Sequence, residues 1–149
     1  MLIKLIIIGV MSVYACVKPE NTDSENVSCI KTITNQDIIT GDIISNCSKL
    51  TAENNWTGYL CLCKVNTLNK NYERARETCF KAKELNPFSI DVYLEISRMY
   101  EKQGLVDEAI SEAEFAVNMD TANLDANMLI ASLFEKKKPE TSLKYYNNY

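Results

Sequence analysis

The strongest constraint on the fold is an internal repeat. Stretches that begin at Trp56, Ile90 and Leu124 align when the sequence is shifted by 34 residues each time. An apolar column and a small-residue column recur at this spacing, at Leu62, Ile96 and Ile130 and at Cys63, Ser97 and Ala131. A period of this length indicates successive copies of one small unit, each of which buries its apolar face against its neighbours.

The second copy predicts a helical hairpin. Tyr93, Ile96 and Tyr100 recur at i, i+3 and i+7, which places them on one face of a helix. Gly104 suits a tight turn, because glycine adopts positive φ without steric cost. In the first copy Lys70-Asn71 stands at the turn, and we expect Asn71 to accept the left-handed geometry.

This pattern resembles the tetratricopeptide repeat, TPR. The resemblance covers residues 56–149, with repeats at about 56–89, 90–123 and 124–149, the last incomplete and turning at Lys138-Pro139. It implies an all-α fold of antiparallel helical hairpins stacked as a short solenoid. It also implies that the domain binds a protein partner and is not an enzyme.

Residues 36–55 fall into the same frame as half a repeat. Ile39, Ile43, Cys47 and Leu50 share one helical face, which predicts a helix near 36–50 that covers the first repeat. Gly41 and the β-branched isoleucines lower the helix propensity, so a strand over 37–44 stays open as the alternative.

The first 15 residues predict a signal peptide. Lys4 precedes an apolar run that ends at Ala15 and is shorter than the ~20 residues that span a bilayer. Val13–Cys16 resembles the lipobox of bacterial lipoproteins, which implies a lipid on Cys16 and a flexible, lipidated tether over residues 16–35. Ordinary signal cleavage and a core helix are the alternatives. Val17, in place of an aspartate, favours the outer membrane.

Two further cysteines occupy small columns of one predicted hairpin. Cys63 and Cys79 lie on its two helices, where either a disulfide or two buried thiols would fit. The chain contains no C-x₂-C pair, so we expect no zinc site.

Composition excludes several functions. The chain has no histidine, a formal net charge of −4 and no glycine-rich phosphate loop. These features argue against histidine-based catalysis and against binding to a nucleic-acid backbone. We expect no catalytic residue, no cofactor and no metal.

The TPR resemblance places a partner-binding groove along the first helix of each repeat. The side chains that we expect there are Leu60, Lys64, Leu68, Leu94, Arg98, Lys102, Met128 and Leu129. Lys64 and Arg98 share one column beside an apolar strip, a combination that suits an acidic peptide or helix. The carboxylate clamp of chaperone-binding TPR domains is missing, because Leu60 and Lys64 occupy its columns. A solvated face without a ligand is the alternative.

These features together predict a small TPR lipoprotein of the bacterial cell envelope. It would act as a scaffold or adaptor, in the assembly of a pilus or an outer-membrane complex. A soluble periplasmic or secreted repeat protein without a lipid is the alternative. A further alternative places the partner on the open C-terminal edge, where Leu133, Leu143, Tyr145 and Tyr146 would be exposed.

Overall fold

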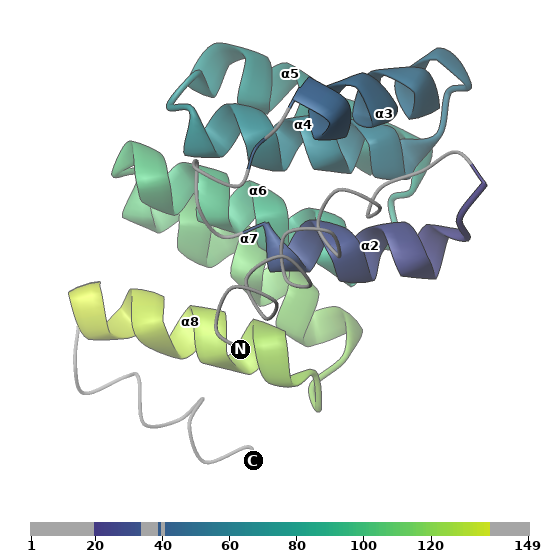
Figure 1. Ribbon diagram of the computed structural model, residues 1–149. Coiled ribbons are helices and arrows are strands. Elements are labelled where there is room, and N and C mark those ends of the chain that lie inside the picture. The colour runs from purple at the N-terminus through teal and green to yellow at the C-terminus, as the bar shows by residue number, and fades with distance from the viewer. Residues whose placement is uncertain (1–19, 34–38, 40, 138–149) are drawn as a thin grey trace, which may run out of the picture. The chain divides into compact units, whose positions relative to one another are not determined.

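The computed structural model describes residues 20–33, 39 and 41–137 (Figure 1). Within this part of the chain there are seven helices and no strand. The helices are α2 (Asp23–Thr32), α3 (Gly41–Ala52), α4 (Trp56–Leu68), α5 (Tyr72–Leu85), α6 (Ile90–Gln103), α7 (Val106–Met119) and α8 (Leu124–Lys137). The chain divides into two compact units, residues 1–85 and residues 86–149.

In the first unit, α4 lies between two helices. It packs on α5, with which it forms the hairpin of the first repeat, and on α3 (Figure 1). Gly58 allows the close approach of α3, because a Cβ there would lie 2.5 Å from Leu50 Cβ and 2.8 Å from the Cys47 carbonyl oxygen. The two helix backbones therefore meet at a position that only glycine fills without displacement.

The predicted helix upstream of the first repeat is confirmed as α3. It begins at Gly41 and ends at Ala52, so it is shifted towards the C-terminus from the expected 36–50. Ile43, Cys47 and Leu50 face the core and are at most 1% exposed. Ile43 and Ile44 are helical, so the strand alternative is wrong over this part of 37–44: burial of one helical face outweighs the low propensity of these residues.

Part of the predicted flexible tether is instead helix α2. Thr22 and Glu25 form a capping box, in which each side chain bonds the other residue's backbone N–H. Asn26, Val27 and Ile30 are buried against the rest of the first unit. The sequence Thr22-Asp23-Ser24-Glu25 carries this signal, because a threonine three residues before a glutamate marks a helix start.

The turns of the two hairpins use equivalent residues. Gly104 ends α6 with a φ of 86°, as the sequence predicts. In the first repeat Lys70, one period before Gly104, takes a φ of 59°. The expectation that Asn71 would adopt this geometry is therefore wrong, because the turn places the left-handed residue in the glycine column whatever residue occupies it.

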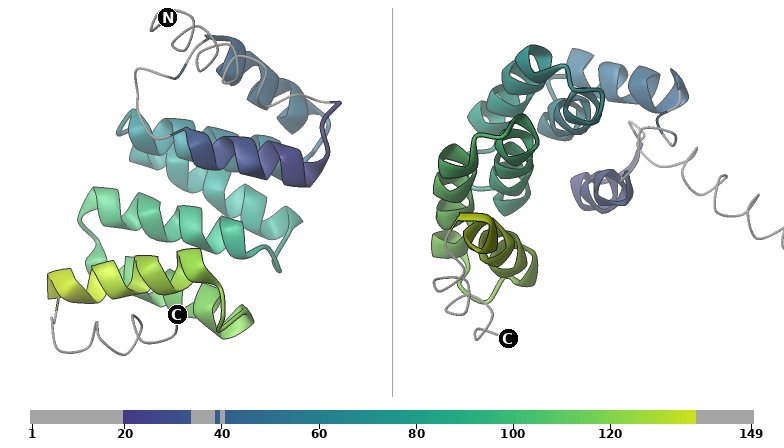
Figure 2. Two further views of the ribbon diagram at one scale, coloured as in Figure 1. Left: turned by 60° about the horizontal axis from the view of Figure 1, so that its bottom comes forward. Right: turned by 90° about the vertical axis from the view of Figure 1, so that its left-hand side faces the viewer.

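In the second unit, α6 and α7 form the hairpin of the second repeat and α8 packs on both (Figure 2). The small residues of the repeat columns lie inside, and the Ser97 hydroxyl donates a 2.7 Å hydrogen bond to the Ala109 carbonyl across the hairpin. Leu133 is fully buried in the same apolar cluster. It is therefore not part of an exposed edge, because its side chain faces α7 and α6 as a core residue.

Several predicted features lie outside the described residues. They are the signal peptide, the lipidated Cys16, the turn at Pro139, and Leu143, Tyr145 and Tyr146. Among the residues that the structure describes, none of the helices combines the length and the apolar character required to cross a bilayer.

Candidate functional site

The groove residues of the first repeat are more buried than the sequence predicts. Leu60 is 1% exposed and belongs to the core, so its expected place in an accessible apolar strip is wrong. The cause is that α4 packs on helices α2, α3 and α5, which leaves little of its surface free. Lys64 and Leu68 are half-buried.

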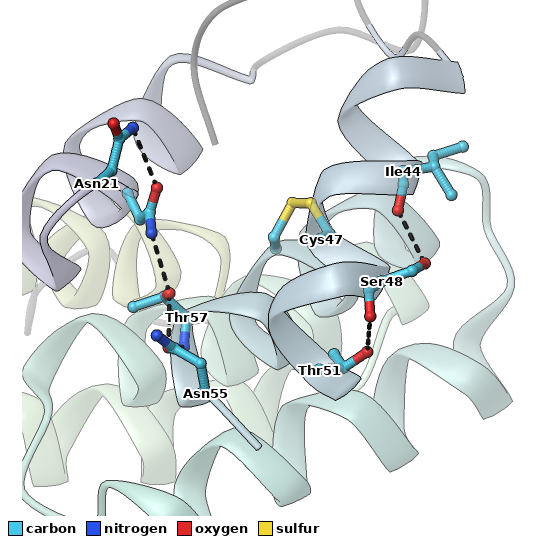
Figure 3. Close-up of a disulfide and its surroundings, with 9 residues drawn as sticks. Asn21, Ile44, Cys47, Ser48, Thr51, Asn55 and Thr57 are labelled. Atoms are coloured by element: carbon cyan, nitrogen blue, oxygen red, sulfur yellow. Dashed lines mark hydrogen bonds between the residues drawn. A yellow bond between two sulfur atoms is a disulfide. The ribbon is translucent and has the colours of Figure 1, made fainter. Parts of the chain in front are cut away.

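Helix α2 lies on α4 at the start of the predicted groove. The Asn26 amide donates a hydrogen bond of 3.5 Å to the Thr57 hydroxyl, which in turn donates to the Asn55 side chain at 2.8 Å (Figure 3). Asp23 accepts from the Trp56 indole at 2.8 Å and from the Asn55 amide at 3.3 Å. One turn of α2 thus forms a polar network with the first turn of α4.

The groove residues of the second unit are also partly in the core. Leu94 is 1% exposed and Leu129 is 8% exposed, and both lie in the apolar cluster of the second unit. The expectation that they line an accessible strip is wrong, because α7 and α8 close over the apolar side of α6. Arg98 bonds Glu95 at 2.8 Å, and the Glu95 side chain is only 5% exposed.

Two predicted groove residues of the second unit are accessible. Lys102 is exposed, and Met128 retains 53% of its surface. Lys136 of α8 forms an ion pair with Glu101 of α6, so charged side chains connect the first helices of two successive repeats. This face is therefore polar and charged, with Met128 as its exposed apolar side chain. Lys64 and Arg98 belong to different units, and their joint action in one groove stays a prediction.

A second accessible surface lies on α7 and α8. Phe115 is 55%, Met119 39% and Leu124 56% exposed, and the Phe115 ring lies 5.9 Å from that of Tyr93. Phe115 and Met119 were not predicted because they stand outside the apolar and small columns of the repeat, whereas Leu124 begins the third repeat in the column of Trp56 and Ile90. Large apolar residues outside those columns are the signal that could have found them.

Within the described residues, two disulfides join helices of the first unit. Cys47–Cys61 joins α3 to α4 with the Cα atoms 5.8 Å apart, and Cys63–Cys79 joins α4 to α5 with the Cα atoms 4.9 Å apart. Of the two alternatives for Cys63 and Cys79, the structure has the disulfide. The Cys47–Cys61 bond was not predicted, because its two cysteines do not belong to one repeat hairpin. Residues 61 and 63 point to opposite sides of a helix, so α4 is bonded on both sides.

The described residues contain no cluster of three or more carboxylates and thiols that could hold a metal ion. The cysteines of α4 are both oxidised, so neither provides a thiolate nucleophile. Glu95 is neutralised by Arg98 within its own helix. The accessible surfaces of the described residues present hydrogen-bonding groups, charges and exposed apolar side chains.

The sequence repeats every 34 residues, and the helices of each hairpin pack together at the small residues of the repeat. These two features define a TPR fold, as predicted. Solved structures of MamA, a TPR-containing protein, are similar to this chain. One crystal structure has 21% identity, covers 93% of this chain and 83% of its own, and superposes with a TM-score of 0.64. A second has 21% identity, coverage of 85% and 70%, and a TM-score of 0.62. A third, from AMB-1, has 17% identity, coverage of 95% of both chains and a TM-score of 0.58.

At these identities the likeness establishes the fold, and the predicted all-α hairpin architecture is confirmed. No family model matches the sequence, and the search of curated proteins found no match.

Proposed function

We propose that this protein is a non-enzymatic TPR scaffold that binds a protein partner at the bacterial cell envelope. The observation that carries the proposal is the fold itself. Its hairpins bury the repeat columns and leave other side chains on the surface, among them Lys102, Met128 and Phe115. Proteins built from such repeats present extended surfaces, and extended surfaces suit peptides and helices rather than small substrates.

The disulfides support a location outside the cytoplasm. Cytosolic thiols are kept reduced, whereas structural disulfides form and persist in secreted and periplasmic proteins. Both described bonds join buried cysteines of adjacent helices. This environment agrees with the predicted signal peptide over residues 1–15 and with anchoring through Cys16 in the outer membrane, facing the periplasm.

Metabolic labelling tests the anchor. Wild-type protein should incorporate an alkyne-tagged palmitate and fractionate with membranes, and Cys16→Ala should be unlabelled and soluble. A wild type that is never labelled but is exported would favour the soluble periplasmic or secreted alternative. The proposed role in the assembly of a pilus or an outer-membrane complex depends on the identity of the partner.

Crosslinking and affinity capture with the full chain test the scaffold function and locate the surface. If the groove of the second unit is the site, Lys102→Glu with Met128→Asp should lower capture severalfold, because both side chains are exposed and their replacement spares the core. Phe115→Asp with Met119→Asp is the matched variant on α7. Loss of capture in the α7 variant alone would move the site to α7, and unchanged capture in both would contradict both surfaces.

Arg98→Glu is a poor probe of the same groove. It would place a second carboxylate beside Glu95, which is 5% exposed, and would break the ion pair between Glu95 and Arg98. Unpaired buried charge destabilises the fold by several kcal/mol, on the order of 3–5. Loss of capture in that variant would therefore report unfolding as well as loss of contact.

A further inference from the structure

The position of α2 on the groove side of α4 distinguishes the first repeat from the second. Thr57 holds the second position of its repeat, one period before Asp91 and two before Asp125. The three residues differ in accessibility: Thr57 is fully buried, Asp91 is half-buried and Asp125 is exposed. Asn26 of α2 donates to Thr57, so α2 covers in the first repeat a position that is accessible in the third.

The contacts that hold α2 in place are those of a ligand helix. Val27 and Ile30 of α2 are buried, as is Ile33 directly after its end, and these three supply its apolar anchors. The polar network with α4 adds to these contacts, and in it Asn21 also donates to Asn26 at 3.3 Å (Figure 3). An amphipathic helix that places aliphatic anchors in a groove is a recurring mode of peptide recognition.

Helix α2 is held on α4 without a covalent bond between them. Cys61 and Cys63 are the cysteines of α4, and both are bonded, to Cys47 of α3 and Cys79 of α5. The α3–α4–α5 layer is therefore fixed independently of α2. A helix of ten residues is marginal by itself, so α2 depends on its contact with α4 for its own stability.

We infer that the face of α4 beneath α2 is a helix-binding site, that α2 is its intramolecular occupant, and that a helix of a protein partner takes this place by displacing α2. The inference rests on the proposed scaffold function and specifies one surface for it. Partner binding at the first repeat is then coupled to the release of α2.

The occupant defines the chemistry of the partner helix. The site takes β-branched aliphatic side chains at i and i+3 of the helix, as in Val27 and Ile30, and a third directly after the helix end, as in Ile33. One turn before the first of these anchors it takes a carboxylate, as in Asp23, because the Trp56 indole and the Asn55 amide both present donors there. The partner is thus an amphipathic helix with an acidic residue near its N-terminus.

The chain contains its own reporter of this exchange. Trp56 is the only tryptophan, and its indole donates to the Asp23 carboxylate of α2 at 2.8 Å. Release of α2 exposes this indole, so its emission follows docking directly. Ile30→Asp removes a side chain that is 1% exposed and should release α2, whereas the matched control Ser28→Asp alters an exposed position of the same helix.

A synthetic α2 peptide tests the site in the full-length chain. The probe comprises residues 20–33 with Cys29→Ser to prevent thiol exchange and a lactam between positions 24 and 28, both exposed, to hold the helix. In wild type it competes with an α2 of millimolar effective concentration. The peptide binds only those molecules in which α2 has left α4, and in wild type these are a small fraction. Ile30→Asp should therefore bind the labelled peptide about tenfold or more tightly than wild type or Ser28→Asp in fluorescence anisotropy.

Each outcome is decisive. Tighter binding to Ile30→Asp, with Trp56 emission returning to the wild-type value, supports the inference. Equal affinity for the three proteins, or no binding to Ile30→Asp, overturns it. A peptide carrying Ile30→Asp itself should not bind, and Asp23→Ala in the full chain, a milder change, should give an intermediate affinity. The loss of helicity in Ile30→Asp, measured by far-ultraviolet circular dichroism, should not exceed the ten residues of α2, which shows that the other helices stay folded. None of these measurements needs the natural partner, so their failure is separate from a failure of partner capture.

Discussion

The two units share one repeat but are stabilised by different means. The first contains every cysteine of the chain, and its α4 is bonded to helices on both sides. The second, residues 86–149, contains no cysteine and is built around a single apolar cluster. Their charges differ as well: the first has 10 bases and 9 acids, the second 6 bases and 11 acids. Units built on the same repeat can therefore be stabilised either by disulfides between their helices or by an apolar core without disulfides.

Reduction of the disulfides should destabilise the first unit more than the second, and this is the largest effect that we expect. Their cysteines are separated by 14 and 16 residues, for which loop closure predicts a loss of ~3 kcal/mol of unfolding free energy each. Hydrogen exchange with and without reductant should show loss of protection in α3, α4 and α5. The double variant Cys47→Ser with Cys61→Ser should reproduce part of this loss of protection. An equal loss in α6 and α7 would show that the units do not differ in this way.

Gly58→Ala tests the close approach that the crosslinked unit uses. The added Cβ would meet Leu50 Cβ at 2.5 Å and the Thr51 nitrogen at 2.7 Å, so we expect destabilisation of about 1–3 kcal/mol in chemical denaturation. Gly41→Ala is the matched control, because nothing lies within 4 Å of its Cβ. In the second repeat the same column holds the fully buried Val92. Equal stability of the two alanine variants would contradict the close approach of α3 to α4.

The two hairpin turns give a smaller, reciprocal test. Lys70 has a φ of 59° and Gly104 a φ of 86° at equivalent positions. Left-handed geometry costs a non-glycine residue roughly 1 kcal/mol. Lys70→Gly should therefore raise the melting temperature, and Gly104→Ala should lower it. A change of the same sign in both variants would mean that the turn geometry does not control stability here.

The smallest predicted effect concerns the cap of α2. Hydrogen bonds from the Thr22 backbone N–H and hydroxyl lower the pKa of Glu25 below its ordinary value of 4.5. A carboxyl with a lowered folded pKa stabilises α2 fully above 4.5, and this contribution is lost as pH falls through the lower value. The protection of α2 amides, corrected for the intrinsic exchange rate, should fall as pH drops below about 4.5, and it should fall more in wild type than in Glu25→Gln. Identical profiles would contradict a role for the ionised cap.

The helices of the repeats could be predicted in kind and nearly in place. Leu62, Ile96 and Ile130 recur with the period, and hairpins are the compact solution for that pattern. The groove could not be predicted to the same degree. A repeat frame states which side a residue faces, but Leu60 and Leu94 show that burial on that side depends on which further helices pack there.

The sequence by itself determined the hairpins, the glycine turn at Gly104 and the buried small columns, because these depend on spacing along one chain. Only the tertiary structure decided the pairing of Cys47 with Cys61, the need for Gly58 and the place of α2. Each of these depends on the distance between segments that are not neighbours in the repeat frame. Residues 23–32 have a helix signal of their own, but the surface on which they lie is set by Thr57 and Trp56, more than twenty residues away.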